Sequence, residues 1–187
     1  MVTHQVKVAV IGDGTVGKTS LVNSFSGKSS FMEEYLMTIG VNIVVHKMEI
    51  NKDVKINFAI WDLGGQPRFN AVRPQFYKGA QLILYVYDIS NRESFENLSK
   101  WLQEVNKSRG SPSSYKGFLV GNKLDLAEYR IIDFEAAKAF AEKMGFEAYI
   151  EISVKDGSGI SKLTDMLADN IIKNASQKLV EKIELVS

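Results

Sequence analysis

The sequence predicts a three-layer α/β fold, in which a six-stranded, mostly parallel β-sheet is covered by helices on both faces. Short β-branched runs alternate with stretches of helical periodicity, which is typical of parallel sheets. Several of these runs are apolar throughout, as in strands that are buried on both faces. The 187 residues, of which 45% are hydrophobic and 24% charged, fit one globular domain.

Six runs are expected to form the strands. The second and third are separated only by residues 51–53 (NKD), a polar gap that predicts a hairpin and therefore one antiparallel edge strand. The runs are Val6–Ile11, Ile43–Ile50, Val54–Trp61, Leu82–Tyr87, Gly117–Val120 and Ala148–Ile152.

Helices are predicted between these strands from apolar spacing and from capping residues. One helix is expected to begin near Lys18. Ser90 and Glu93 fit a capping box with Ser90 as the N-cap. Phe134–Met144 reads as a helix that Gly145 ends. The apolar positions at helical spacing are Phe95, Leu98, Leu102 and Val105 in one segment, and Ile160, Leu163, Leu167 and Ile171 in the last.

Composition excludes several classes of protein. The net charge of +1 offers no strong field for nucleic acid or acidic lipid. Cysteine is absent, so disulfides, thiolate metal sites and cysteine lipidation are excluded, and Val2 stands where N-myristoylation needs glycine. No apolar run approaches the ~18 residues of a membrane span. We therefore expect a cytoplasmic protein with no direct lipid anchor, which reaches any membrane through partners.

The segment between the first strand and the first helix matches the motif G-x-x-x-x-G-K-[ST]. Its glycines let successive backbone N–H groups converge on one anion. The Lys18 ammonium is expected to reach the β- and γ-phosphates, and the Thr19 hydroxyl to ligate Mg²⁺. The predicted phosphate loop consists of Gly12, Asp13, Gly14, Thr15, Val16, Gly17, Lys18, Thr19 and Ser20.

A second motif, GNKLDL, follows the fifth strand and predicts the base. The carboxylate of Asp125 can accept from both N1–H and N2–H of guanine, a pair of donors that adenine lacks. The stem of Lys123 can lie across the purine, and Asn122 is expected to brace the loop. After the sixth strand come Ser153, Val154 and Lys155, where the Val154 N–H could donate to guanine O6.

Taken in order, these motifs resemble the conserved boxes of Ras-superfamily small GTPases, over roughly residues 5–175. The resemblance implies a P-loop NTPase fold, with residues 1–175 as the GTPase domain and 176–187 as a C-terminal tail. The segments TIGVNI (38–43) and YDISNRESFENL (87–98) are most similar to the Rab branch. The second switch, WDLGGQ, instead resembles Arf-type members.

The resemblance also implies how a third phosphate would be sensed. Asp62 would hold a Mg²⁺-bound water, and the Gly65 N–H would donate to the γ-phosphate. Gln66 would orient the attacking water. Thr38 would complete the Mg²⁺ site from the first switch, so loss of the γ-phosphate releases both segments. By position, Phe31 resembles the aromatic that covers the guanine edge, and Tyr35 the one that closes over the phosphates.

The resemblance implies a monomeric GTP/GDP switch served by activator, exchange and effector proteins at its switch regions. No arginine occurs between residues 31 and 40, so the first switch offers no arginine finger of its own. An arginine supplied in trans by an activator protein would accelerate hydrolysis by about 10³–10⁵-fold. Two alternatives stay open. One is a nucleotide-loaded scaffold with negligible hydrolysis. The other is an ATP-using phosphoryl transferase, against which Asp125 argues.

Replacing Pro67 by Glu should raise the intrinsic rate of GTP hydrolysis several-fold. Proline pins its own φ and disfavours the α region for the preceding residue, so Pro67 restricts the movement of Gln66. The rate is measured by single-turnover hydrolysis of preloaded GTP in both proteins. An unchanged rate would show that Pro67 does not restrain Gln66.

Overall fold

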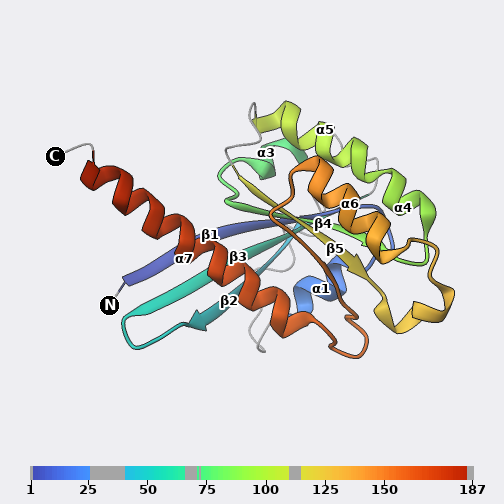
Figure 1. Cartoon of the computed structure of the whole chain (residues 1–187), viewed down its shortest axis with the longest axis horizontal. Coiled ribbons are helices and arrows are strands. Elements are labelled where there is room, and N and C mark those ends of the chain that lie inside the picture. The colour runs from blue at the N-terminus through green and yellow to red at the C-terminus, as the bar shows by residue number, and fades with distance from the viewer. Residues whose placement is uncertain (1, 26–40, 66–70, 72, 110–114, 185–187) are drawn as a thin grey trace.

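The computed structural model describes residues 2–25, 41–65, 71, 73–109 and 115–184, with side chains as far as residue 176. It shows a six-stranded sheet with helices on both sides (Figure 1). The strands are β1 (Val2–Ile11), β2 (Val41–Glu49), β3 (Val54–Leu63), β4 (Leu82–Asp88), β5 (Lys116–Asn122) and β6 (Ala148–Glu151). The helices are α1 (Lys18–Ser24), α3 (Arg73–Tyr77), α4 (Arg92–Glu96), α5 (Leu98–Arg109), the 3₁₀ segment η3 (Leu124–Tyr129), α6 (Phe134–Met144) and α7 (Ile160–Glu184).

The order of the strands confirms the predicted fold class. It is β2-β3-β1-β4-β5-β6, and the β2–β3 pair is antiparallel while the other described pairs are parallel. The carboxyl ends of the parallel strands therefore meet at one edge of the sheet. The predicted phosphate and base loops leave the sheet at this edge.

The predicted hairpin joins β2 to β3, and a side chain closes its turn. The Asn51 Oδ1 accepts hydrogen bonds from the backbone N–H groups of Asp53 at 2.9 Å and Val54 at 3.0 Å. This is the local capping that favours asparagine in turns. Several strands are longer than predicted: β1 begins at Val2, β3 continues to Leu63, and β5 spans Lys116–Asn122.

The first helix after β4 starts one residue later than the sequence suggests. Asn91, rather than Ser90, is the N-cap of α4, and its side chain accepts from the Ser94 N–H at 3.1 Å. The Ser90 hydroxyl instead donates to Asp88 Oδ1 at 2.6 Å, so it is not available for capping. The predicted helical run is also divided into α4 and α5 at Asn97.

Helix α6 begins and ends where the sequence predicts. Asp133 caps α6 by accepting from the N–H groups of Glu135 and Ala136, and Gly145 ends it in a left-handed conformation with φ of 75°. The last helix, α7, continues past residue 175, the predicted end of the GTPase domain, to Glu184. Its end extends beyond the sheet (Figure 1). The assignment of residues 176–187 to a separate tail stays a prediction.

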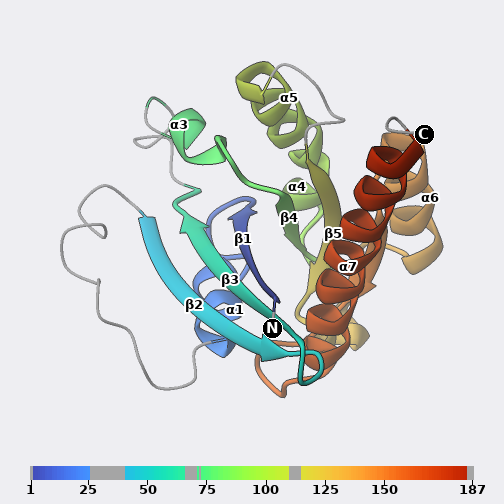
Figure 2. The same ribbon diagram turned by 90° about the vertical axis from the view of Figure 1, so that its left-hand side faces the viewer.

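Two apolar clusters hold the layers together, one on each face of the sheet (Figures 1 and 2). On one face Leu21 and Val22 of α1 pack with Leu163 and Leu167 of α7. On the other face side chains from α3, α5 and α6 pack against the sheet, among them Tyr77, Trp101 and Ala137. These layers bury the strands and leave their carboxyl edge to the loops.

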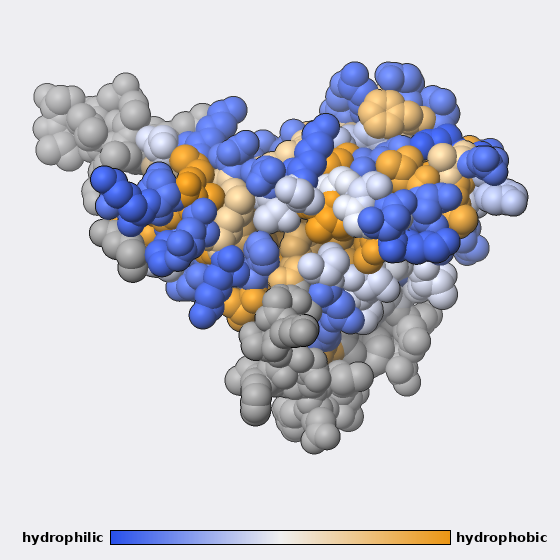
Figure 3. All heavy atoms as spheres, turned by 90° about the horizontal axis from the view of Figure 1, so that it is seen from below, coloured by the Kyte–Doolittle hydropathy of each residue, from blue (hydrophilic) through white to orange (hydrophobic). Residues whose placement is uncertain are grey.

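Figure 3 shows the face of the protein seen from below. In Figure 3, apolar side chains lie in small groups between hydrophilic ones on the face seen from below. Among the described helices, none is both long enough and apolar enough to cross a bilayer.

Candidate functional site

The phosphate loop follows β1 and precedes α1, the strand-to-helix junction that its motif requires. Gly12 has φ of 142° and Gly17 has φ of 96°, in the region that favours glycine. A Cβ at Gly12 would overlap the carbonyl oxygen of Val86, and one at Gly17 would overlap Asn122 Nδ2. Both glycines are therefore required by close backbone packing against the ends of β4 and β5.

Lys18 is folded back against its own loop. Its side chain is only 6% exposed, and its Nζ donates to the Asp13 carbonyl at 2.5 Å. Burial lowers the pKa of Lys18, while the nearby charges of Asp62 and Asp13 oppose that change. The ammonium is thus held at the loop with little water around it, which strengthens its interaction with an anion.

Thr19 and Asp62 converge from α1 and β3, as the predicted metal site requires. The Thr19 hydroxyl donates to Asp62 Oδ2 at 2.5 Å, and Asp62 is 7% exposed. Burial raises the pKa of Asp62, opposed by the hydrogen bond from Thr19 and the charge of Lys18. A hydroxyl and a buried carboxylate are hard oxygen donors and fit Mg²⁺. Among the described residues, no group of three or more His, Cys, Asp or Glu side chains could hold a metal ion.

Gly65 lies directly on the phosphate loop. A Cβ at this position would stand 2.5 Å from the Gly12 carbonyl oxygen and 3.0 Å from the Gly14 nitrogen. The start of the predicted second switch therefore packs backbone to backbone against the loop. The other predicted switch residues, Phe31, Tyr35, Thr38 and Gln66, lie outside the described residues, as does Pro67.

Asn122 joins the phosphate loop to the loop after β6. It is 3% exposed, and its Nδ2 donates to the Val16 carbonyl at 2.8 Å. Its Oδ1 accepts from the Val154 N–H at 3.2 Å. From the end of β5, Asn122 therefore contacts both the phosphate loop and the loop after β6. The predicted donation from Val154 to guanine O6 stays a prediction, and in this structure Asn122 holds that N–H.

Asp125 and its neighbours form the predicted base site. Ser153 Oγ donates to Asp125 Oδ1 at 2.8 Å, and Lys155 Nζ lies 3.4 Å from Oδ2. Lys123 has a left-handed backbone with φ of 69°, and its Nζ lies 2.7 Å from Asp88 Oδ2. All the base-site residues named by the two motifs are thus brought together at the carboxyl ends of β5 and β6.

Two supports of this site were missed by the sequence analysis, because no nucleotide-binding motif includes their residues. The first is Asp88 at the end of β4, which fixes the Lys123 ammonium. Burial alone would raise the pKa of Asp88, but hydrogen bonds from Lys123 and Ser90 outweigh it and lower the pKa. The YDIS segment that contains Asp88 supported only the resemblance to the Rab branch.

The second support is the pair of Arg130 and Glu151. Two guanidinium nitrogens of Arg130 lie 2.6 Å from the two carboxylate oxygens of Glu151, and the Tyr149 hydroxyl donates to the same carboxylate. Since Arg130 follows η3 and Glu151 precedes Ser153, this pair holds both base loops to the sheet. Its members are far apart in the chain, so no local pattern indicates it.

Thr15 has an unusual backbone conformation within the loop. Its φ of 64° is left-handed, which is a strained conformation for a β-branched residue. Its side chain is exposed. Such strain often occurs at functional sites, where the surrounding structure imposes it.

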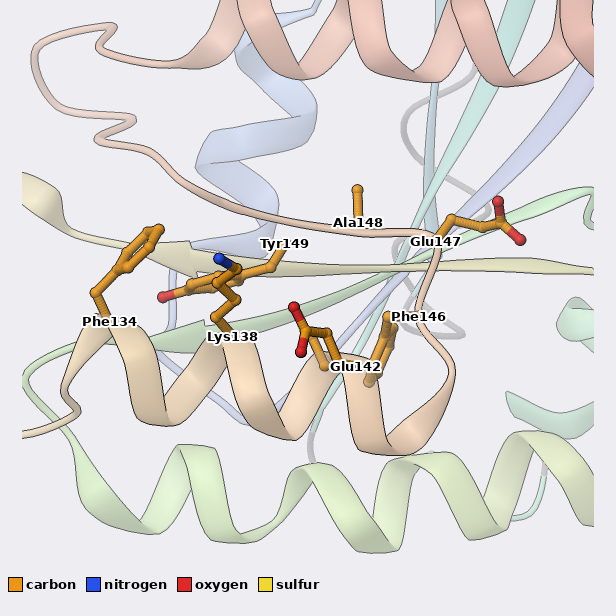
Figure 4. Close-up of a pocket in the computed structure, with 8 residues that line it drawn as sticks. Phe134, Lys138, Glu142, Phe146, Glu147, Ala148 and Tyr149 are labelled. Carbon is orange, nitrogen blue, oxygen red and sulfur yellow. The ribbon is translucent and has the colours of Figure 1, made fainter.

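A separate groove of about 260 Å³ lies between α6 and β6. Figure 4 shows Lys138 and Glu142 on α6 beside Tyr149 of β6. None of the described residues predicted to contact nucleotide lines this groove, so it is distinct from the candidate site.

Comparison with known proteins agrees with the geometry of the site. Residues 7–173 match the Ras family. The chain is 39% identical over 166 residues to the Ras-related protein RIC1 of Oryza sativa subsp. japonica, covering 88% of this chain and 79% of that protein. It is 40% identical over 157 residues to the Ras-related protein RABD2a of Arabidopsis thaliana (83% and 74%). It is 37% identical over 172 residues to the Ras-related protein Rab-1C of Dictyostelium discoideum (92% and 83%).

Replacing Thr15 by glycine should raise the free energy of unfolding by about 1 kcal/mol, because glycine adopts the left-handed conformation without the steric penalty. Unfolding by urea is measured with GDP and Mg²⁺ present at two GDP concentrations. The difference between variants should be the same at both concentrations if nucleotide affinity is unchanged. The control is Thr15→Ala, which keeps a Cβ in the strained position. An equal gain in both variants would exclude backbone strain as the cause.

Proposed function

The chain belongs to the Ras family as a small GTPase of the Rab type, and from this premise we propose how its own residues hold and read the nucleotide. It binds GTP and GDP with Mg²⁺, hydrolyses GTP to GDP and acts as a two-state switch together with regulators and effectors. Family membership does not favour the alternative of a scaffold that barely hydrolyses, or that of an ATP-using transferase.

The phosphate loop is proposed to bind the α- and β-phosphates through the backbone N–H groups of residues 13–18. Lys18 would turn from the Asp13 carbonyl, to which its Nζ donates in this structure, to the β- and γ-phosphates. Desolvation disfavours the charged ammonium and so increases the benefit of an anionic partner. Strain at Thr15 supports the view that the loop is shaped for binding.

Thr19 and Asp62 are proposed to hold Mg²⁺, with Thr38 joining from the first switch. The meeting of Thr19 Oγ1 and Asp62 Oδ2 carries this assignment. Bound Mg²⁺ would neutralise charge on the β- and γ-phosphates. Asp62 would act on the metal through a bound water, whose hydrogen bond its buried carboxylate at the end of β3 would accept.

Asp125 is proposed to select guanine. It is held at the carboxyl end of the sheet by the Ser153 hydroxyl, which accounts for one lone pair and leaves others for the base. Asn122 and the Arg130–Glu151 pair keep the surrounding loops in place. The stem of Lys123, held at its end by Asp88, would cover one face of the purine, and Phe31 its edge.

The switch itself is proposed to lie in Thr38, Tyr35 and the segment from Gly65 to Gln66. Contact between Gly65 and the phosphate loop supports this proposal, since a γ-phosphate would lie next to both. Gln66 would orient the attacking water. We also propose that the protein is a monomer in the cytoplasm, and that effectors and activators bind at the two switches.

Replacing Asp125 by Asn should exchange guanine specificity for xanthine. The amide offers one acceptor and one donor, which match N1–H and the C2 carbonyl of xanthine but oppose N2–H of guanine. Affinity for GDP should fall by roughly 100-fold, while affinity for xanthosine diphosphate should rise. Equilibrium binding of the two nucleotides is compared in the parent protein, in the variant and in Asp165→Asn, an exposed position on α7. If Asp125→Asn behaves like Asp165→Asn, Asp125 does not read the base.

Replacing Gln66 by Leu should slow single-turnover GTP hydrolysis by about 10²-fold, because the amide that positions water is lost. Binding of GTP should change little, since Gln66 acts on the water. The matched control is Gln103→Leu, the same substitution on the exposed surface of α5. Equal rates in the parent and in both variants would remove Gln66 from the mechanism.

A further inference from the structure

Arg73, the first residue of α3, is a buried cation that none of the predicted boxes includes. It is only 4% exposed. Its Nε and NH2 atoms donate to the two carboxylate oxygens of Glu104 on α5, at 2.9 Å and 2.8 Å. The Tyr77 hydroxyl donates to the same carboxylate at 2.6 Å. Such a fork is geometrically rigid, so Arg73 is fixed to α5.

A further donor of Arg73 reaches the second switch. Its NH1 donates to the Gly64 carbonyl at 2.9 Å. Gly64 directly precedes Gly65, whose backbone packs on the phosphate loop. Arg73 therefore holds the carbonyl of the peptide that joins Gly64 to Gly65.

Arg73 also lies next to a second set of contacts, which joins helix α5 to the phosphate loop. The guanidinium of Arg73 lies over the ring of Trp101, 4.4 Å from its centroid. Trp101 Nε1 donates to Asp13 Oδ1 at 2.8 Å, and Asn97 Nδ2 donates to Asp13 Oδ2 at 2.7 Å. Helix α5 is thus bound both to the phosphate loop, through Asp13, and to the second switch, through Arg73.

The two routes differ in the part of the nucleotide that they affect. The backbone of the phosphate loop, to which Asp13 belongs, is proposed to bind the α- and β-phosphates that GTP and GDP share, whereas Gly65 is proposed to meet only the third phosphate. Holding Gly64 and Gly65 in place before binding removes an entropic cost that GTP binding would otherwise meet, and GDP binding would not. A ligand shifts an equilibrium only by its differential interaction with the two states.

We propose that Arg73 is a positioning residue that presets the Gly64–Gly65 peptide for the γ-phosphate and so sets the preference of this protein for GTP over GDP. The inference rests on the proposed function, in which Gly65 contacts the γ-phosphate. Trp101 and Asn97 instead position the phosphate loop for both nucleotides.

The test measures affinities for GDP and for a non-hydrolysable GTP analogue, with Mg²⁺, in the full chain. Arg73→Ala should lower the affinity ratio of the GTP analogue to GDP by about tenfold, the cost of ordering one further residue. Arg73→Lys should give a smaller decrease, because one ammonium cannot reproduce the fork and the stacked face together. This second variant keeps the test valid if Arg73→Ala does not fold.

Trp101→Phe serves as the matched control on the other route. It keeps a ring beneath Arg73 but removes the donor to Asp13, so affinity for both nucleotides should fall together and their ratio should stay constant. A general loss of stability would likewise leave the ratio unchanged. An altered ratio is therefore specific to the switch.

Gly65→Ala separates failure of the inference from failure of its premise. If Gly65→Ala lowers the ratio and the Arg73 variants do not, the positioning role of Arg73 is wrong and the proposed function stands. If Gly65→Ala leaves the ratio unchanged, the γ-phosphate contact itself is wrong, and the inference fails with it. A lowered ratio in Gly65→Ala and in the Arg73 variants supports both.

Discussion

The binding edge of this protein depends on one buried amide. Asn122, at the end of β5, donates to the Val16 carbonyl and accepts from the Val154 N–H, so it joins the phosphate loop to the base loop after β6. The cost of leaving a buried donor or acceptor unpaired is about 1–3 kcal/mol, which makes each of these contacts a constraint on the loop that it meets. Asn122 also restricts position 17 to glycine, because a side chain there would overlap Asn122 Nδ2.

Much of the fold, and the position of many candidate site residues at strand ends, could be predicted because their signals are local. The apolar runs gave the six strands, and NKD gave the hairpin whose turn Asn51 closes. The motifs around Lys18 and Asp125 were placed correctly at strand ends, since a parallel sheet brings those ends together. The prediction of Ser90 as the N-cap of α4 was wrong for a physical reason. Asp88 binds the Ser90 hydroxyl, and a sequence pattern does not reveal such competition for a hydrogen bond.

What could not be predicted is the set of side chains that hold the loops from behind. Asp88 with Lys123, Arg130 with Glu151, and Arg73 with Glu104 join residues far apart in the chain. The sequence alone does not show whether a charged side chain is solvated or paired with an opposite charge, because this depends on which residues the fold brings together. Each pair is at least partly buried. Removing one partner would therefore leave a charge with less water than it needs.

The side chains that hold the base and phosphate loops differ from the one that holds the second switch, as a two-state switch requires. The base loops are joined to the sheet by Asn122 and by Arg130 with Glu151, and the phosphate loop is joined to α5 through Asp13. Under the proposed function these are the segments that contact what GTP and GDP have in common. The Gly64–Gly65 peptide is bound to α5 by Arg73, and it is proposed to meet only the third phosphate. A change at that phosphate can therefore move the second switch while the supports of the base and the phosphate loop stay in place, because Arg73 holds the Gly64 carbonyl whereas Trp101 and Asn97 hold the Asp13 carboxylate.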